Sequence, residues 1–281
     1  MKMDSPIFPS IDRIPGIRNV WSFNLEEEVR LLSDLVDDYP YVSFDTEFPG
    51  TLVRSLDRSE DGEYKAVKWN VDMLKLIQLG ITLMDEDGNL AEVHGLPCSW
   101  QFNFREFSME NDLYALDSID LLQQAGIDFG RNQAIGADIT VFSELLMTSG
   151  LVLNEHVHWI GFATQYDVGY LLKALTSRPL PETEGEFFEL VQLFFPNLYD
   201  IKYLPVVKFM AELQGGLQRL ADSLDVQRVG ISHQAGSDSL LTAFTFFKLI
   251  RKYYPSLEYV RQHSGKIAGL GDDAKGYMYS Y

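Results

Sequence analysis

The chain has 281 residues, of which 46% are hydrophobic and 23% are charged, so it can bury a full core in one large domain or two small ones. Acidic residues outnumber basic residues by 41 to 23, which gives a formal net charge of −18. A field of this sign repels polyanions and excludes charge-driven, non-specific binding to nucleic acid. Any chemistry on nucleic acid must therefore be local.

Cysteine content and the first residues indicate the compartment. The single cysteine, Cys98, excludes an intramolecular disulfide. Residues 1–22 lack the basic start and apolar run of a signal peptide, and no apolar run approaches the roughly 20 residues of a membrane-spanning helix. We therefore expect a protein of a reducing compartment that does not enter a membrane.

A helix followed by a strand is the first predicted pair of elements. Asn24 is placed to cap the helix, with Glu27 as its capping-box partner. Apolar residues at helical spacing follow and end near Pro40: Val29, Leu32, Leu35 and Val36. From Tyr41 to Phe48 the pattern becomes strict alternation, which predicts a strand with Ser43, Asp45 and Glu47 on one face.

Two further strands follow. Residues 74–84 are predicted as a strand with Gly80 as a bulge, and the acidic cluster 85–89 is a turn. Residues 100–105 alternate between aromatic and polar side chains, which predicts a returning strand half exposed to water. These three strands form a meander.

Helices dominate the remaining sequence. Helices are predicted around residues 117–125 and 138–149, with Asp117 and Asp138 as caps. A strand over 157–162 and a helix over 167–175 come next, and helices with short strands continue to about residue 255. This order predicts an α/β fold, a mixed sheet covered by helices in a single domain over 14–271. Residues 1–13 and 272–281 are predicted to be flexible ends.

Two carboxylates lie on one face of the first strand. Asp45 and Glu47 are separated by one residue, so both project from the same face about 7 Å apart. An ordinary polar strand face explains the pair if that edge is solvated. The apolar neighbours Phe44 and Phe48 and the breaker that follows favour a buried strand end, where two acids need a cation.

Three further polar residues occur at helix starts. Asp167 lies where a strand passes into a helix, and Asp238 begins the long helix with the stripe Leu240, Leu241, Phe244 and Phe247. Each of these acids is explained equally well as a helix cap or first-turn acid. His233, five residues before Asp238, is taken alone an ordinary loop or core histidine.

Taken together, these residues form a pattern with a chemical meaning. Four carboxylates supply hard oxygen ligands for two divalent ions, which can clamp the attacking and leaving oxygens of a phosphoryl displacement. Histidine can take a proton from water near neutral pH, so His233 is the candidate general base. The pattern requires the first strand and the last long helix to pack together.

The sequence also resembles a known family in several motifs. FDTEFPG at 44–50, YDVGYLL at 166–172 and HQAGSDSLLT at 233–242 look like signatures of the Caf/Pop-type nuclease of the Ccr-Not deadenylase complex. That family belongs to the DEDD exonucleases with histidine. The resemblance covers about residues 14–271 and includes the following stretches: NVDMLKLIQLG at 70–80, WQFNF at 100–104, DSIDLL at 117–122 and ELLMTSG at 144–150.

The resemblance implies a ribonuclease H-like mixed sheet and a 3′ to 5′ poly(A)-specific exoribonuclease that shortens mRNA tails and releases 5′-AMP. It implies two divalent ions, Mg²⁺ or Mn²⁺, held by Asp45, Glu47, Asp167 and Asp238, with His233 as the base. Implied partners are single-stranded poly(A), the large scaffold subunit of the Ccr-Not complex, a leucine-rich-repeat nuclease and antiproliferative adaptor proteins. The implied location is the cytoplasm, with the nucleus as a second compartment.

The chain departs from the family beside the site. Relatives usually read F-H-S-G-Y-D before the third acid, whereas this chain has Ala163, Thr164 and Gln165 between Phe162 and Tyr166, a change predicted to shift local activity or metal preference. Residues 211–214 lack the lysines that relatives often carry, which predicts lower RNA affinity.

Two alternatives remain at this point. A proofreading-type DNA exonuclease would use the same metal chemistry, but the similarity outside the acids follows the deadenylase family. A catalytically silent scaffold subunit of the same complex is disfavoured because all five site positions are filled.

Overall fold

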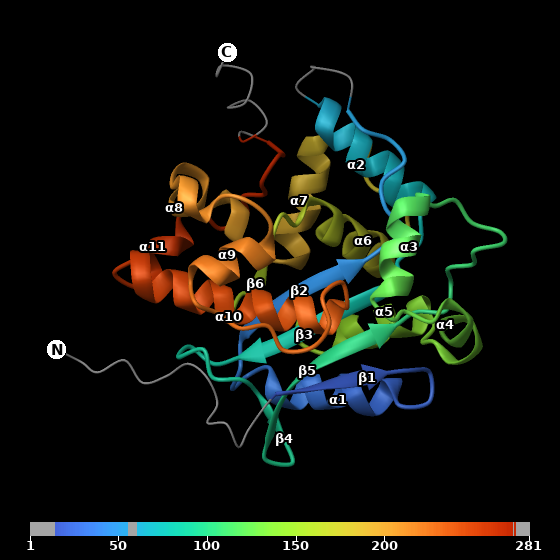
Figure 1. The fold of residues 1–281 in the computed structure, drawn as a ribbon, viewed down its shortest axis with the longest axis horizontal. Coiled ribbons are helices and arrows are strands. Elements are labelled where there is room, and N and C mark those ends of the chain that lie inside the picture. Colours follow the sequence, from blue (N-terminus) through green and yellow to red (C-terminus); the bar gives the residue numbers. More distant parts are fainter. Residues whose placement is uncertain (1–14, 56–60, 272, 274–281) are drawn as a thin grey trace.

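A mixed sheet forms the centre of the computed structural model, which describes residues 15–55, 61–271 and 273 (Figure 1). β-branched and aromatic residues, which suit a pleated surface, are frequent in its longer strands. In spatial order the strands are β1 (Gly16–Val20), β5 (Leu96–Asn103), β3 (Gln78–Met84), β2 (Tyr41–Glu47), β6 (His158–Gly161) and β7 (Asn197–Asp200), while β4 (Glu92–Val93) pairs with β5.

The strand directions place the carboxyl ends of three strands at one edge of the sheet. β2, β3 and β5 form the predicted antiparallel meander. β6 pairs with β2 in parallel and β7 pairs with β6 in parallel, so the carboxyl ends of β2, β6 and β7 lie at the same edge. β1, which sequence reasoning missed, pairs with β5 in parallel. The predicted mixed sheet is confirmed.

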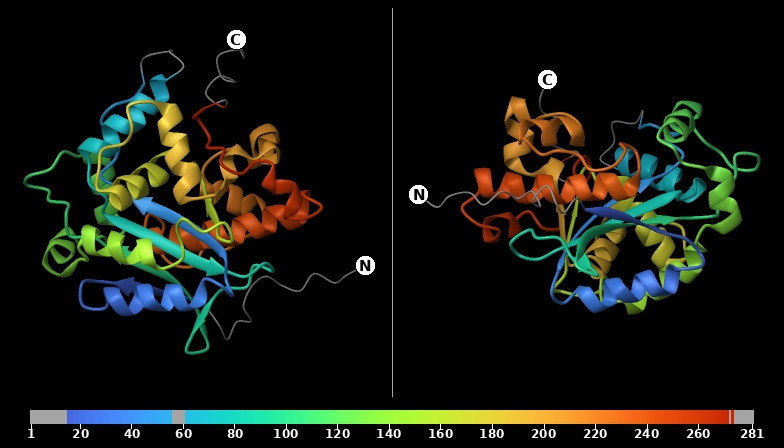
Figure 2. Two further views of the ribbon diagram at one scale, coloured as in Figure 1. Left: turned by 180° about the vertical axis from the view of Figure 1, so that it is seen from behind. Right: turned by 60° about the horizontal axis from the view of Figure 1, so that its bottom comes forward.

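Helices cover both faces of the sheet, as the right panel of Figure 2 shows for α10 above the strands and α1 below them. One face and its core involve α1 (Leu25–Leu35), α2 (Gly62–Met73), α5 (Ile139–Thr148), α6 (Gln165–Thr176) and α7 (Glu184–Phe194). The other involves α8 (Pro205–Phe209), α9 (Leu217–Ser223), α10 (Ala235–Tyr253) and α11 (Glu258–Arg261). A third cluster packs between α3 (Leu116–Gln124) and α4 (Phe129–Ile135).

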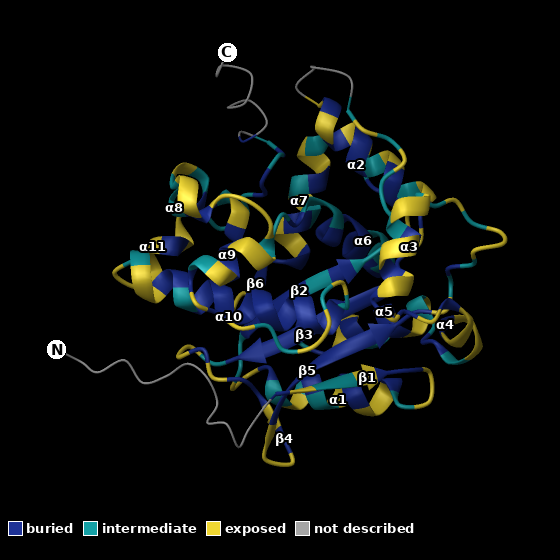
Figure 3. Ribbon diagram, in the orientation of Figure 1, coloured by how far each residue is buried: buried dark blue, intermediate teal, exposed yellow. Residues whose placement is uncertain are grey.

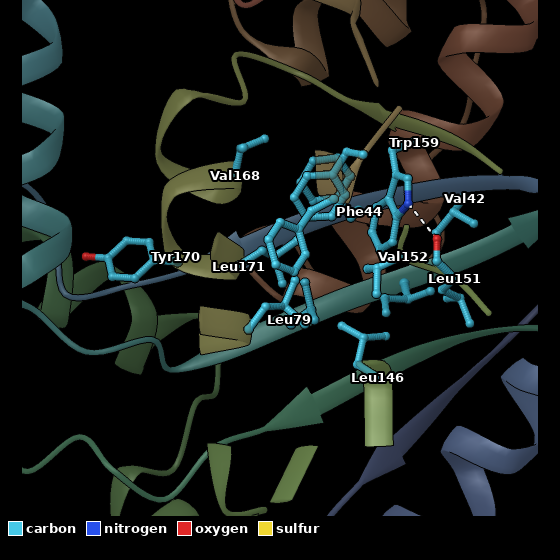
Figure 4. Packing of buried hydrophobic residues seen from close by; sticks show 14 of the residues in the cluster. Val42, Phe44, Leu79, Leu146, Leu151, Val152, Trp159, Val168, Tyr170 and Leu171 are labelled. Atoms are coloured by element: carbon cyan, nitrogen blue, oxygen red, sulfur yellow. Dashed lines mark hydrogen bonds between the residues drawn. The ribbon is translucent and has the colours of Figure 1, made fainter. Parts of the chain in front are cut away.

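The first core fixes α6 against the end of β2. Phe44 of β2 is almost fully buried and meets Trp159 of β6 edge to face, with ring centroids 5.2 Å apart. Val168 and Leu171 of α6 belong to the same cluster (Figure 4). Burying one such large apolar side chain stabilises the fold by about 1.5–3 kcal/mol. This packing fixes the position of Asp167, which precedes Val168, relative to the end of β2.

The second core holds α10 flat on the opposite face. Most residues of α10 are buried, as the dark blue of this helix in Figure 3 shows, because α10 packs on the sheet and shares an apolar cluster with residues of α8, α9 and α11. The Ser43 hydroxyl of β2 donates to the Ser239 carbonyl at 2.7 Å. The first strand and the last long helix therefore pack together, as the site prediction required.

Two strand predictions were wrong, both because of α10. Gly80 is in regular register between Asp45 and Gln101 and forms no bulge. Its missing side chain instead makes room for α10, since a Cβ there would lie 1.8 Å from the Ala235 carbonyl oxygen. The strand at 100–105 was predicted to be half exposed, but both faces of β5 are buried from Pro97 to Asn103.

Helix capping was predicted with mixed success. Asp138 caps α5 by accepting from the Thr140 and Val141 amides, as predicted. The Asn24 capping box is wrong, because the Asn24 side chain binds the preceding turn through Trp21 and Asn19. Asp117 caps nothing, since α3 begins one residue earlier.

The predicted flexible ends, 1–13 and 272–281, lie outside the described residues except for Asp273. Asp273 is buried and pairs with Lys208. Within the described ranges, no helix has both the length and the apolar character needed to cross a bilayer.

Gly80→Ala is predicted to destabilise the protein by about 1–3 kcal/mol or more, because the obstacle is backbone that cannot rotate away. Gly185→Ala is the matched control. Gly185 is helical with nothing near its Cβ position, so alanine there should stabilise by about 0.5–1 kcal/mol. Thermal unfolding of both variants checks this, and equal melting temperatures would contradict the close approach of α10.

Candidate active site

The carboxyl end of β2 presents two acids toward α10. Asp45 and Glu47 share a face with Ser43, whose hydroxyl bonds to α10. Both acids are partly exposed, and the chain leaves the sheet directly after them at Phe48. The predicted placement of this pair at a strand end is confirmed.

Asp167 reaches the same place from the opposite layer. One of its carboxylate oxygens, Oδ1, accepts from the Thr46 amide at 2.9 Å and from the Thr46 hydroxyl. Thr46 lies between Asp45 and Glu47, so the third acid is tied to the strand between the first two. Asp167 is not the cap of α6, because Thr164 is the residue at the cap position, but it does lie in the first turn of the helix, as the alternative also allowed.

A buried acid that the sequence did not reveal holds the start of α6. Asp200, at the end of β7, accepts from the backbone amides of Ala163 at 2.8 Å, Thr164 at 3.0 Å and Ala268 at 3.0 Å. Ala163 has a left-handed φ of 59°, which costs energy for a residue with a Cβ. The Asp200 bonds keep this turn closed and thereby orient Asp167.

Asp238 is held at both of its carboxylate oxygens. Oδ2 accepts from the His233 backbone amide at 2.9 Å, and Oδ1 accepts from Arg228 Nη1 at 2.5 Å. The residue at the cap position of α10 is Gln234, so Asp238 is not the cap, but it does lie in the first turn, as the alternative also allowed. Arg228 also donates to Gln218 of α9 at 2.6 Å, which anchors the guanidinium.

His233 lies at the open side of this cluster. One ligand atom each of Glu47, His233 and Asp238 lie within 4.8 Å of one another. The His233 side chain is exposed, and its backbone is left-handed with a φ of 63°. A ring nitrogen in this position can exchange a proton with solvent or contribute to a metal site.

The acids raise one another's proton affinity. Burial, and then the charges of Asp238 and Asp167, hold the pKa of Asp45 and of Glu47 well above their usual values, while Arg228 opposes the shift. Burial raises the pKa of Asp167 to about 7 against the two Thr46 hydrogen bonds. The carboxylates repel one another, and one arginine compensates for only part of their charge.

This donor set fits a divalent metal ion. Carboxylate oxygens are the ligands that Mg²⁺ and Mn²⁺ prefer, and a cation relieves the repulsion that the raised pKa values report. The structure brings all five predicted residues together from three separate parts of the chain. The roles of Arg228, Thr46 and Asp200 were missed. Thr46 lies inside the motif at 44–50, but its bond to Asp167 joins distant parts of the chain, and no motif marks Arg228 or Asp200.

Residues at which the chain departs from the family pattern lie beside Asp167, at the start of α6. The Gln165 side-chain oxygen is buried without a hydrogen-bond partner at the start of α6. Lys202 lies over the Phe162 ring, 5.7 Å from its centroid. Residues 211–213 form a short 3-10 helix. The predicted effects of these departures on activity and on RNA affinity stay predictions.

The seven-stranded mixed sheet covered by helices is the ribonuclease H-like fold of DEDD exonucleases. Solved structures of E. coli exonuclease I share the fold, with a TM-score of 0.51 at 11% identity over 79% of this chain and 42% of theirs. The sequence matches the CAF1 family ribonuclease over residues 20–138 and 132–246. The chain belongs to the CAF1 family of ribonucleases.

Individual relatives match over most of their length. A probable CCR4-associated factor 1 homolog of Arabidopsis thaliana, number 7, is 52% identical over 260 residues, which are 91% of this chain and 93% of the relative. The poly(A) ribonuclease pop2 of Schizosaccharomyces pombe is 48% identical over 245 residues, or 86% of this chain and 71% of the relative.

Solved structures of relatives agree with the fold. The Mg²⁺- and Mn²⁺-bound form of S. pombe Pop2p superposes with a TM-score of 0.83 at 45% identity, covering 90% of this chain and 99% of that one. A structure of the yeast NOT1 MIF4G domain co-crystallized with CAF1 gives a TM-score of 0.77 at 33% identity, covering 92% of this chain and 99% of the matched chain.

The raised pKa of Asp167 predicts how stability depends on pH. With a folded pKa of about 7 and an unfolded pKa of about 3.9, this group stabilises the fold fully below pH 4, and the contribution is lost as pH rises through 7. Asp167→Asn keeps an acceptor for Thr46 and should raise the melting temperature of the metal-free protein at pH 8 more than at pH 5.

Thermal scans in EDTA at the two pH values measure this difference. Asp120→Asn, which removes the same charge from an exposed position on α3, is the control and should give no such gain. A loss of stability at both pH values in Asp167→Asn would identify Asp167 as a purely structural acid.

Proposed function

We propose that this ribonuclease is a deadenylase, which removes adenylate residues from the 3′ end of mRNA poly(A) tails and releases 5′-AMP. The convergence of Asp45, Glu47, Asp167 and Asp238 around the end of β2, with His233 beside them, carries the proposal. Membership in a ribonuclease family and the name of the S. pombe relative, a poly(A) ribonuclease, support the substrate.

Four carboxylates would hold two divalent ions, Mg²⁺ or Mn²⁺. When bound, such ions polarise a phosphodiester and lower the pKa of water. Support comes from the repulsion among the acids and from the relative described as bound to Mg²⁺ and Mn²⁺. Asp45, Glu47, Asp167 and Asp238 would all be ligands, and the bonds from Thr46 and Arg228 orient the two that come from helices.

His233 is the proposed general base. A ring nitrogen of His233 takes a proton from the attacking water, and its exposed position lets the proton pass to solvent. The backbone of the same residue donates to Asp238, so the base and one acid move together. Proton transfer of this kind contributes about 10²- to 10⁴-fold to a rate.

The proposed partners follow the relatives. A yeast CAF1 was co-crystallized with the NOT1 MIF4G domain, which supports a contact between this chain and the large scaffold subunit of a Ccr-Not complex. A leucine-rich-repeat nuclease and antiproliferative adaptor proteins are further proposed partners. The cytoplasmic location, with the nucleus as a second compartment, stays a prediction.

The substrate proposal is tested by degradation of labelled 20-mers of oligo(A), the other homopolymers and single-stranded DNA, with Mg²⁺, Mn²⁺ or EDTA. We expect oligo(A) to shorten stepwise from its 3′ end, to release 5′-AMP and to need a divalent ion. Asp45→Asn is the inactive control. Preferential degradation of DNA would favour a proofreading-type exonuclease, and no degradation of any substrate would favour a silent scaffold.

His233→Asn is predicted to lower kcat by about 10²- to 10⁴-fold, because the general base is lost. Asparagine tolerates the left-handed φ of 63° and keeps the backbone bond to Asp238, so it is a better test than alanine. Calorimetric Mn²⁺ affinity should stay nearly unchanged, and raising the pH should partly restore the rate. Loss of Mn²⁺ binding would instead identify His233 as a ligand.

A further inference from the structure

Three amide side chains lie beneath the first turn of α10, beside the apolar side chain of Ile17 of β1. Gln78 of β3, Gln101 of β5 and Asn103 of β5 are all buried on the sheet face that α10 covers. Gln234, at the cap position of α10, points its amide among them. A buried amide is costly unless each polar atom is paired, so the pairing in this group is informative.

The sheet glutamines cap α10, and the cap residue of α10 binds the sheet glutamines in return. Gln78 Oε1 accepts from the Ala235 amide at 3.3 Å, and Gln101 Oε1 accepts from the Gly236 amide at 3.1 Å. Helix starts leave such amides without partners, and here no cap side chain supplies one. In the other direction, Gln234 Oε1 accepts from Gln101 Nε2 at 2.7 Å and from Gln78 Nε2 at 3.2 Å.

The group is also tied to its surroundings. Gln234 Nε2 donates to the Ala125 carbonyl at the end of α3, at 2.9 Å. Gln78 Nε2 donates to Asn103 at 2.8 Å, and Gln101 Nε2 donates to Asn19 beside it at 3.2 Å. The start of α10 is therefore bound to β3, β5 and α3 by directional bonds, and Gln101 connects it to β1.

These bonds act on the site through two residues close to Gln234, namely His233 and Asp238. His233 precedes Gln234 in the chain, and the Asp238 amide donates to the Gln234 carbonyl at 3.0 Å. The His233 amide in turn donates to the Asp238 carboxylate. Any shift of Gln234 along the sheet moves both His233 and Asp238 relative to Asp45 and Glu47.

We propose that Gln78, Gln101 and Gln234 are positioning residues for the reaction. They fix the position of the start of α10 along the sheet so that Asp238 and His233 meet the acids of β2. Apolar packing alone is non-directional and would leave α10 free to slide by a fraction of an ångström, whereas paired hydrogen bonds define one position. The role in catalysis rests on the proposed activity, whereas the role in metal binding rests on the proposed metal site and not on the substrate.

The test compares Gln101→Met with a control at the same interface. Methionine keeps the length of glutamine and removes both the acceptor for Gly236 and the donor to Gln234. Thr82→Val is the control, because it removes the contact of the Thr82 hydroxyl with the Ser239 hydroxyl, 3.0 Å apart, one turn further along α10. Gln78→Met is a second variant, interpreted in the same way if Gln101→Met fails to fold.

We expect Gln101→Met to weaken calorimetric Mn²⁺ affinity about 10- to 100-fold, the usual effect of losing a residue that orients ligands. Its kcat on oligo(A) should fall about as much, with KM within about threefold of the wild-type value. Thr82→Val should lose comparable thermal stability, yet its Mn²⁺ affinity and kcat should stay near those of the wild type.

The outcomes separate this proposal from the proposed function. Equal Mn²⁺ affinities in the glutamine variants, Thr82→Val and the wild type would overturn the positioning role even if the enzyme is a deadenylase. A wild-type protein that does not degrade oligo(A) would overturn the proposed function, and weaker Mn²⁺ binding in Gln101→Met would then still support positioning.

Discussion

The distance between α10 and the sheet at Gly80 is the constraint on which the rest of the structure depends. Gly80 pairs with Asp45 on one side and with Gln101 on the other, and it lies directly under the Ala235 carbonyl. Any side chain at position 80 would push the start of α10 away from the sheet. Because α10 lies this close to the sheet, Asp238 can share a site with the acids on β2, and polar residues of β5 are buried.

Two layers meet at the end of one strand, and this arrangement gives the site its charge. Asp167 arrives from one face and Asp238 from the other, each held by residues outside its own helix. Hydrogen bonds from Thr46 favour the charged form of Asp167 and burial opposes it, while burial and the neighbouring carboxylates raise the pKa of Asp45. The folded protein thus holds a concentrated negative charge that a divalent cation would relieve.

The overall charge of the chain makes the local site more important. At −18, the protein has no net attraction for a polyanion, so its hold on nucleic acid depends on local contacts. Arg228 is already paired with Asp238, and Lys208 is paired with Asp273. Cations bound by the acids would supply positive charge where a phosphate has to be contacted.

Local pattern was sufficient for the elements that carry the chemistry. Alternation identified β2 and the shared face of Asp45 and Glu47, and helical spacing identified α10 with Asp238 in its first turn, because both depend only on residues near in sequence. Motif resemblance then indicated the family and the set of five residues. The caps at Asn24 and Asp117 failed because a side-chain amide or carboxylate has several nearby partners, and spacing does not choose among them.

Only the tertiary structure decided which surfaces face each other. Asp200 and the reciprocal glutamines at 78, 101 and 234 lie far from their partners in sequence, and Arg228 is ten residues from Asp238. Their roles exist only once α10 and β7 take their places on the sheet. The local pattern likewise predicted a bulge at Gly80, whereas the absence of a side chain there allows α10 to lie close to the sheet. The sequence by itself determined the elements and the acids they carry, because periodicity is local. Their geometry came from packing, because it depends on contacts between elements that the local pattern does not relate, such as Thr46 with Asp167 and Gln101 with Gly236.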